Sequence, residues 1–356
     1  MLTKISLKLC IAAIASICVI CPRPTRTADN FFGVGEDAAV EISPETEKRV
    51  RRGLEFLAKR QNDDGSWSSQ YGKNVGEVSL ALMAFMSMGN LPGEGEYGST
   101  VAKGVNWIMA QAQNNGLIQY TGQKQQAPVM YGHALATLML SEAWGQTRRP
   151  DIGQVLRKAV DLIVRVQGRR GGWNYESKPE DGDTSVSVMQ ILALKSAQEA
   201  GIYVDKKVID MAVKLIISRY DAKNHGYGYM GNQFNMGHSG SSAAGATIML
   251  VCADKENEKW EAIKDKYAIQ PVKFHIDILS GKRDTKGLGW APYFWYYSGV
   301  SSYAAGEQLF KECMQALDGL AAKRQQRDGG WGSVWETSFA ILSQAMPYRY
   351  LPIYQR

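Results

Sequence analysis

Three ionisable side chains of this sequence could exchange protons with a bound molecule: His133, Asp183 and Glu336. Carboxyl and imidazole groups act as general acid and base when they lie within hydrogen-bond reach of one substrate. The three residues are far apart in the chain, but each stands near the start of a predicted apolar helix. They are therefore predicted as catalytic residues of a fold in which those helices start at a common place.

A second set of polar and aromatic residues is expected to bind the substrate at the same place. Aromatic faces attract positive charge, such as that of a developing carbocation, and helix N-termini favour an anionic group such as a diphosphate. The predicted substrate-binding residues are Glu77, Tyr131, His238, Ser241, Trp295, Tyr296 and Tyr297. Neither a metal nor a cofactor is expected.

Each of these candidates also has a purely structural interpretation. Asp183 precedes an apolar helix, where a capping role is natural. Glu77 and Glu336 near helix starts would favour the helix dipole, and His133 fits a hydrogen-bonded core histidine. The aromatic residues 294–297 could serve packing alone. Both interpretations stay open at this point.

The chain repeats one turn motif, Gln-x-x-x-Gly-x-Trp, at residues 61–67, 167–173 and 325–331. Degenerate copies lie between them, at residues 111–117, at 220–229 and before Trp290. The resulting period of about 53 residues is typical of stacked supersecondary units. The glycines are expected to end a helix, the Gln side chains to satisfy freed backbone groups, and the Trp rings to pack over the turns at the outer rim.

Each repeat contains two kinds of helix. The helix before the turn is amphipathic, as in residues 50–59 and 155–166, so it faces water on one side. The stretch after the turn is apolar nearly all round and must be covered on every side. These stretches are residues 78–88, 134–140, 186–194, 243–251 and 338–346. Six outer helices around six inner ones satisfy both demands only if the array closes, because an open stack exposes its apolar ends. The sequence predicts an all-α fold, an α/α toroid of six helical hairpins with an inner and an outer ring.

Parallel inner helices would gather their N-termini at one mouth of this ring. The residues aligned there are Glu77, His133, Asp183, Ser241, Tyr297 and Glu336. Polar groups would then converge over an apolar, aromatic cavity, which is the composition of a small-molecule site.

The repeats, together with residues 182–196 (Gly-Asp-Thr-Ser-Val-Ser-Val-Met-Gln-Ile-Leu-Ala-Leu-Lys-Ser), resemble the prenyltransferase and squalene-cyclase repeat superfamily. The ending, residues 293–297, 337–342 and 348–354, resembles a secreted bacterial branch of it whose biochemistry is mostly undefined. The resemblance covers about residues 44–354. It implies a terpene-cyclase or prenyltransferase type of toroid with a central apolar cavity for an isoprenoid or similar lipid.

The motifs that carry the chemistry of this superfamily are incomplete here. Squalene-hopene cyclases have Asp-x-Asp-Asp-Thr, whose middle Asp protonates the substrate; residues 180–184 read Glu-Asp-Gly-Asp-Thr, with Gly182 at the proton donor and Asp183 at the last acid. Protein prenyltransferases hold zinc through Asp-x-Cys and a distant His, and no Asp-x-Cys occurs in this chain. A complement-type thioester needs Cys-Gly-Glu-Gln, but residues 305–308 read Ala-Gly-Glu-Gln. Catalysis therefore stays open, and two alternatives remain: a non-catalytic lipid-binding or structural toroid, and a carbohydrate lyase or hydrolase using paired carboxylates with Tyr.

The first 28 residues predict export. Lys4 and Lys8 precede the uncharged residues 9–21, a run too short to span a bilayer as an ordinary helix. We expect a signal peptide at 1–28, a linker at 29–43 and the toroid domain at 44–356, in the periplasm or secreted; an uncleaved anchor is the alternative. Without the leader the formal charge falls from +6 to +2, which gives no argument for nucleic acid. Peripheral membrane contact stays open, as does whether Cys252 and Cys313 form a disulfide or are buried thiols.

Overall fold

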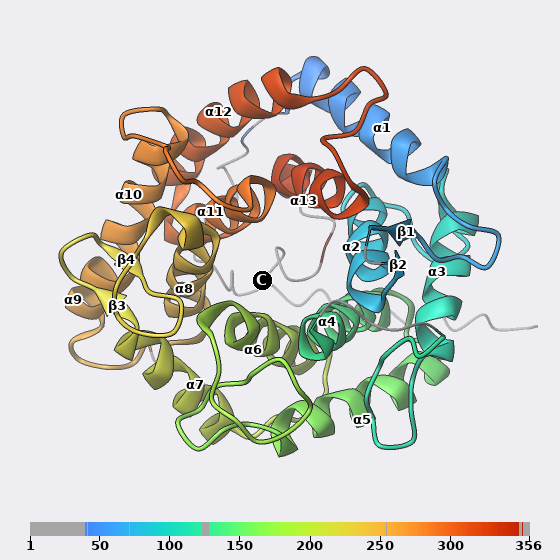
Figure 1. Cartoon of the computed structure of the whole chain (residues 1–356), viewed down its shortest axis with the longest axis horizontal. Helices are drawn as coiled ribbons and strands as arrows, with labels where there is room; N and C mark the ends of the chain where they lie inside the picture. The colour runs from blue at the N-terminus through green and yellow to red at the C-terminus, as the bar shows by residue number, and fades with distance from the viewer. Residues whose placement is uncertain are drawn as a thin grey trace, which may run out of the picture.

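The computed structural model describes residues 40, 42–70, 72–122, 128–253, 255–348 and 351. The predicted signal peptide at 1–28 and most of the predicted linker at 29–43 lie outside these residues. Within them the chain forms two concentric rings of helices (Figure 1). The predicted α/α toroid is confirmed.

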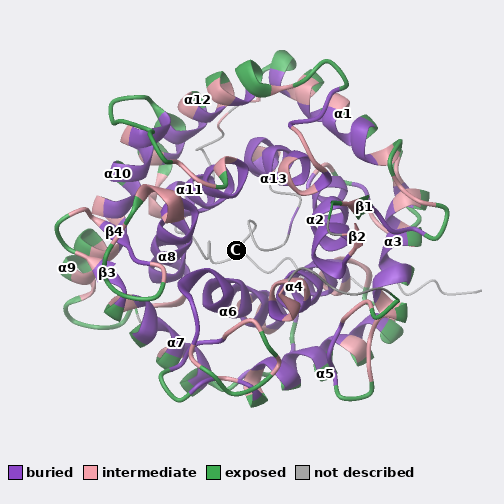
Figure 2. Ribbon diagram, viewed as in Figure 1, coloured by how far each residue is buried: buried purple, intermediate pink, exposed green. Residues whose placement is uncertain are grey.

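The inner ring is built from the helices that follow the turns. They are α2 (Val75–Met86), α4 (Val129–Thr147), α6 (Thr184–Glu199), α8 (Ser239–Cys252), α11 (Ala291–Ala305) and α13 (Val334–Ala345). Each packs against the next around the ring, and α13 packs against α2. These helices are buried along nearly their whole surface, as their apolar composition predicts (Figure 2).

The outer ring is built from the helices that precede the turns. They are α1 (Pro44–Ala58), α3 (Gly98–Ala110), α5 (Pro150–Arg165), α7 (Lys206–Ser218), α10 (Gln270–Leu279) and α12 (Glu307–Arg324). A short helix α9 (Trp260–Lys264) and a π-helical turn η2 (Asp265–Ile269) lead into α10. Figure 2 shows the exposed residues on the outward side of these helices and in the loops.

The remaining elements are short and lie in the turns. Strands β1 (Ser68–Ser69) and β2 (Gly72–Lys73) form one antiparallel pair, and β3 (Tyr220–Asp221) and β4 (Gly226–Tyr227) form another. The 3₁₀ turns η1 (Met236–His238) and η3 (Met346–Tyr348) precede α8 and follow α13. No helix in the described part of the chain is both long and apolar enough to cross a membrane.

The inner helices begin two to five residues before the predicted apolar stretches. The reason is that their first turns carry polar residues, which the apolar pattern leaves out. Asn74, Asp183 and Ser333 each accept a hydrogen bond from a backbone N–H of the following helix. Side-chain caps therefore define the starts of α2, α6 and α13.

The repeated Gln residues tie each turn to the neighbouring outer helix. The amide Nε2 of Gln167 donates to the carbonyl oxygens of Gly171, at 3.0 Å, and Val208, at 2.9 Å. Gln61 and Gln325 make the equivalent pair of bonds. The predicted role of Gln in satisfying backbone groups is confirmed, and one of the two groups belongs to the next repeat.

The three turn tryptophans are anchored in the same way as one another. The indole nitrogens of Trp67, Trp173 and Trp331 each donate to a backbone carbonyl ten residues earlier, at 2.8, 2.8 and 2.9 Å. All three side chains are buried. Their predicted packing over the turns is confirmed.

The ring closes between its first and last described hairpins. Gln325, which follows α12, donates through Nε2 to the carbonyl of Arg49 in α1 at 2.9 Å. The guanidinium of Arg60 lies 3.1 Å from the carboxylate of Asp328, and Arg49 is paired with Asp318. This contact between the last and first hairpins, which we call the seam, thus contains the same Gln side-chain hydrogen bonds to backbone carbonyls as the turns elsewhere in the ring.

Candidate functional site at the mouth of the inner ring

Asp183 is the N-cap of α6 and is 1% exposed. Its Oδ1 accepts hydrogen bonds from the backbone N–H of Val186 and from the hydroxyl of Ser185, both at 2.7 Å. Its Oδ2 accepts from the hydroxyl of Tyr229 at 2.7 Å. Both oxygens are therefore occupied as acceptors, and the capping interpretation of Asp183 is confirmed.

Two further tyrosines extend these hydrogen bonds outward. The Tyr131 hydroxyl pairs with Ser185, and the Tyr175 hydroxyl pairs with Tyr229. Because Ser185 and Tyr229 give their hydrogens to Asp183, Tyr131 and Tyr175 must be the donors in these outer pairs. Tyr131, Tyr175, Asp183, Ser185 and Tyr229 form what we call the tyrosine cluster.

Burial keeps the phenols of this cluster protonated. Desolvation raises the pKa values of Tyr131, Tyr175 and Tyr229 above the usual tyrosine value, and the negative charge of Asp183 raises them further. The outermost oxygens, on Tyr131 and Tyr175, keep lone pairs that can accept a hydrogen bond. The cluster can therefore bind a polar group beside aromatic ring faces.

Side chains around the tyrosine cluster add ring faces and polar atoms without partners. His238 stacks on Tyr229 with ring centroids 4.4 Å apart and an interplanar angle of 8°. Among the described residues, His238 Nδ1, the Ser239 hydroxyl and the Tyr293 hydroxyl are buried with no hydrogen-bond partner. Buried polar atoms of this kind need a hydrogen-bond partner, which either an ordered water or a bound polar group can supply.

His133 lies apart from this cluster. Its Nδ1 accepts from the backbone N–H of Ile118 at 3.2 Å, and its Nε2 lies 3.2 Å from the carbonyl oxygen of Ala159 on the outer helix α5. The ring is fully buried, and burial lowers its pKa to about 4. This is the core placement that the structural interpretation describes, because both ring nitrogens are bonded to backbone.

Glu77 and Glu336 each belong to the cap of their own helix. Glu77 is 6% exposed, and its Oε1 accepts from the Ser69 hydroxyl at 2.7 Å; burial raises the pKa of its carboxyl. Its Oε2 has no partner within the described chain. Glu336 closes a capping box with Ser333, accepting through Oε2 from the backbone N–H and the hydroxyl, both at 2.8 Å.

The aromatic candidates of α11 divide into two groups. Tyr296 and Tyr297 are buried and contact each other with ring centroids 4.9 Å apart, and Tyr296 contacts Phe339 of α13 at 5.5 Å. Trp295 lines a pocket at the rim.

Ser241 lies in the first turn of α8 and is 5% exposed. Of the predicted site residues, the structure brings Tyr131, Asp183 and His238 together.

Comparison with known proteins supports the superfamily resemblance. No family model matches the chain. A stretch of 144 residues, 37% of this chain, is 26% identical to lanosterol synthase ERG7 of Saccharomyces cerevisiae, and this match spans 18% of that protein's length. A variant of type II terpene cyclase MstE from Scytonema, in complex with its substrate geranylgeranyl dihydroxybenzoate, has a similar structure with a TM-score of 0.58. It is 11% identical, and the match covers 86% of this chain and 98% of the cyclase. The chain shares the α/α-toroid fold of this terpene cyclase.

Toroids of a different chemistry have the same architecture. An inactive variant of the α-1,6-mannanase GH76A of Salegentibacter sp. HEL1_6, in complex with α-1,6-mannotriose, matches with a TM-score of 0.63 and 8% identity. The match covers 85% of this chain and 99% of the mannanase. The shared architecture therefore establishes the α/α-toroid fold but does not distinguish between cyclase and mannanase chemistry.

The position that the motif resemblance aligns with the cyclase proton donor, Gly182, is packed against backbone. A Cβ atom added at Gly182 would collide with the main chain of Trp173 and Asn174. The Gly182 carbonyl also accepts a hydrogen bond of 3.0 Å from the buried Arg219 side chain. An aspartate would not fit at this position without movement of the turn, so the local packing accounts for the absence of an acidic side chain here.

Sequence reasoning missed Ser185, Tyr175 and Tyr229, although a signal for the tyrosines was present. Tyr175 stands two residues after Trp173, and Tyr229 stands two residues after Tyr227, which takes the place of the turn tryptophan. Ser69 and Ser333 occupy the same offset after Trp67 and Trp331. In three of these four repeats the hydroxyl contacts a carboxylate at an inner-helix start. Aligning the repeats beyond the tryptophan would have marked this position.

The described residues offer no metal centre. No group of three or more His, Cys, Asp or Glu side chains that could hold a metal ion is found among them. Cys252 and Cys313 are free thiols, and Cys313 is buried.

Proposed function

We propose that this terpene-cyclase-like toroid binds an isoprenoid or a similar small lipid at the tyrosine cluster. The observation that carries the proposal is the convergence of Tyr131, Tyr175 and Tyr229 on the buried Asp183 carboxylate. Their ring faces suit a branched apolar chain, while their hydroxyl groups and the unpaired atoms beside them suit a polar head. The structurally similar cyclase MstE, which binds a geranylgeranyl compound, supports the choice of ligand class.

The proposed activity is binding without protonation of the ligand. A cyclase-type start would need an acidic proton aimed at the ligand, but both Asp183 oxygens accept hydrogen bonds and Gly182 offers no side chain. The phenols, with their raised pKa values, are poor acids. The toroid would thus hold its lipid unchanged, and the export predicted from residues 1–28 would place it outside the cytoplasm.

Mass spectrometry of lipids extracted from the purified protein tests the ligand class, and titration with farnesol and geranylgeraniol gives the affinity. We expect binding of at least one prenyl alcohol, a tenfold or larger loss of affinity in Tyr131→Ala and Tyr229→Ala, and unchanged binding in Tyr203→Ala. Tyr203 is a matched control because its side chain is 85% exposed.

Two outcomes would overturn the proposal. One is the absence of prenyl binding to a folded wild-type protein. The other is conversion of the bound lipid by the wild type that stops in Asp183→Ala, since turnover would show acid chemistry at this carboxylate.

A further inference from the structure

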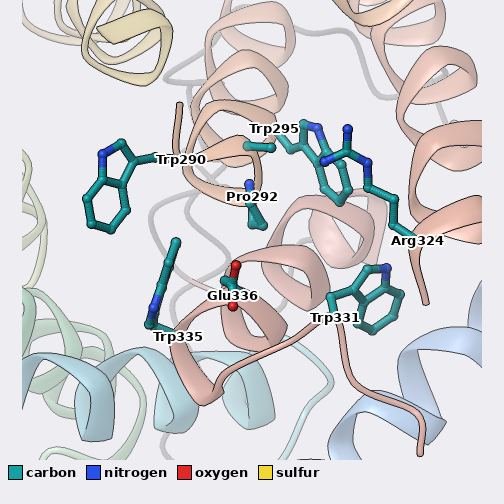
Figure 3. A pocket seen from close by; sticks show the side chains of 8 residues that line it. Trp290, Pro292, Trp295, Arg324, Trp331, Trp335 and Glu336 are labelled. Carbon is teal, nitrogen blue, oxygen red and sulfur yellow. The ribbon is translucent and has the colours of Figure 1, made fainter. Parts of the chain in front are cut away.

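A separate pocket opens at the rim where α11 and α13 begin and α12 ends (Figure 3). Its volume is about 230 Å³. Besides Ala291 and Pro292 it is lined by Trp290, Trp295, Arg324, Trp331, Trp335 and Glu336. No residue of the tyrosine cluster takes part in it.

Trp290 is an exposed wall of this pocket. Its side chain is 60% exposed, and its ring contacts that of Trp335 with centroids 5.2 Å apart. Its backbone φ is 52°, in the left-handed region that disfavours a bulky residue. An exposed tryptophan in this strained conformation is a candidate for a binding role.

The pocket carries one charge of each sign, held apart from each other. Glu336 uses Oε2 in its capping box, whereas Oε1 has no hydrogen-bond partner among the residues described. Arg324 lies over the ring of Trp295, 5.5 Å from its centroid, and makes no ion pair within the described structure. Arg324 would repel a cationic ligand, and Glu336 would repel an anionic one. The pocket therefore favours a neutral ligand with hydroxyl groups that can bond to both.

We propose that this pocket binds one pyranose ring. A pyranose has an apolar C–H face that stacks on indole and an edge of hydroxyl groups that both donate and accept. In Figure 3 the Glu336 carboxylate lies between the rings of Trp335 and Trp331, and Arg324 lies beside Trp295. The volume is below the roughly 300 Å³ at which pockets for drug-sized ligands begin, so it suits a single ring rather than a long isoprenoid.

Calorimetric titration of the full chain with methyl glycosides of glucose, galactose and mannose tests this site. We expect millimolar or tighter binding of at least one. Affinity should fall at least tenfold in Trp290→Gly and Trp335→Ala, and at least threefold in Glu336→Gln. Trp290→Gly removes the ring while accepting the left-handed backbone, so lost binding cannot be ascribed to misfolding. Tyr203→Ala serves as the exposed aromatic control and should bind like the wild type.

The matching trisaccharides distinguish a free sugar from a unit of a longer glycan. Tighter binding of a trisaccharide that is lost in Trp290→Gly would identify a glycan, and equal binding would identify a single sugar; both support the pocket. Absence of binding to all six probes, or binding that survives the two tryptophan substitutions, would overturn the proposal. Tyr131→Ala should leave sugar binding unchanged, so failure of the lipid proposal and failure of this one are separable.

Discussion

The hydroxyl of Tyr229 donates a hydrogen bond of 2.7 Å to Oδ2 of Asp183. Tyr229 follows α7, whereas Asp183 precedes α6, so the cap of one inner helix is completed by the turn of the next repeat. Thr184 repeats this relationship, because its hydroxyl donates to the carbonyl of Gly228 at 2.7 Å. The tyrosine cluster is therefore a joint between repeats as well as a candidate site.

Replacing Tyr229 by Phe should destabilise this joint. The substitution removes the hydrogen bond to the buried carboxylate, which contributes about 1.5–3 kcal/mol to the free energy of unfolding, together with the bond that Tyr229 accepts from Tyr175. Tyr175→Phe is the matched control, because it removes a hydrogen bond to a neutral hydroxyl and should cost about 0.5–1.5 kcal/mol. Urea denaturation of both variants measures the difference, and equal losses would show that the bond to Asp183 has no special strength.

Two buried histidines should make the protein sensitive to mild acid. Burial lowers the pKa of His133 to about 4 and that of His275 to about 3. Between these values and the ordinary pKa of about 6.5, the unfolded chain binds protons that the folded protein does not, so stability falls as the pH falls through this range. From pH 7 to pH 5 each histidine should lower the free energy of unfolding by about 2 kcal/mol.

Carboxylates also titrate in this range, so the histidine contribution needs its own control. In His133→Gln the loss of stability between pH 7 and pH 5 should be smaller by about 2 kcal/mol than in the wild type, even if the variant is less stable at both values. Urea unfolding at the two pH values gives the comparison. An unchanged loss in the variant would rule out His133 as a source of the acid sensitivity.

The turn glycines should be intolerant of a side chain for two separable reasons. Gly171 has a φ of 99°, and a Cβ there would collide with the backbone of Met211 and Ala212 in α7. Gly281 has a φ of 74° but open space around it. Gly281→Ala should therefore lower the free energy of unfolding by about 1–2 kcal/mol through backbone strain alone. Gly171→Ala should lower it by about 1–3 kcal/mol more, because its side chain also overpacks the contact with α7. Chemical denaturation of both variants measures the two losses of stability. Similar losses would mean that α7 moves easily to accommodate the added side chain.

The seam of the ring should depend on Gln325. Its Nε2 bonds both to Gly329, at 2.8 Å, and to Arg49, at 2.9 Å. At about 1 kcal/mol per bond, Gln325→Ala should lower the free energy of unfolding by about 2 kcal/mol. Gln111 makes a single bond of this kind, to the carbonyl of Trp107, so Gln111→Ala should cost about half as much. A Gln325 variant as stable as the wild type would show that the bridge does not contribute to closure.

The architecture could be predicted from the sequence because it depends on local patterns. The alternation of amphipathic and apolar stretches fixes which helices lie outside, and the repeated Gln, Gly and Trp mark each turn. The same patterns placed Asp183 at a helix start, where it caps α6.

The site was harder to predict because its contacts join different repeats. Aligning helix starts puts His133 beside Asp183, but α4 begins four residues before His133, so its ring is carried past the mouth and into the packing against α5. Tyr175 and Tyr229 reach Asp183 only through the placement of neighbouring turns. The Trp290 pocket depends on a left-handed residue and on the end of α12, neither of which leaves a periodic signal.

The bond between Gln325 and Arg49 changes how the repeats must come apart. In an open stack, repeats can fray from either end, one after another. In a closed ring every repeat has two neighbours, and none can leave without breaking two interfaces at once. The seam thus makes unfolding cooperative across all six hairpins, and weakening it would convert one sharp transition into a stepwise loss of repeats.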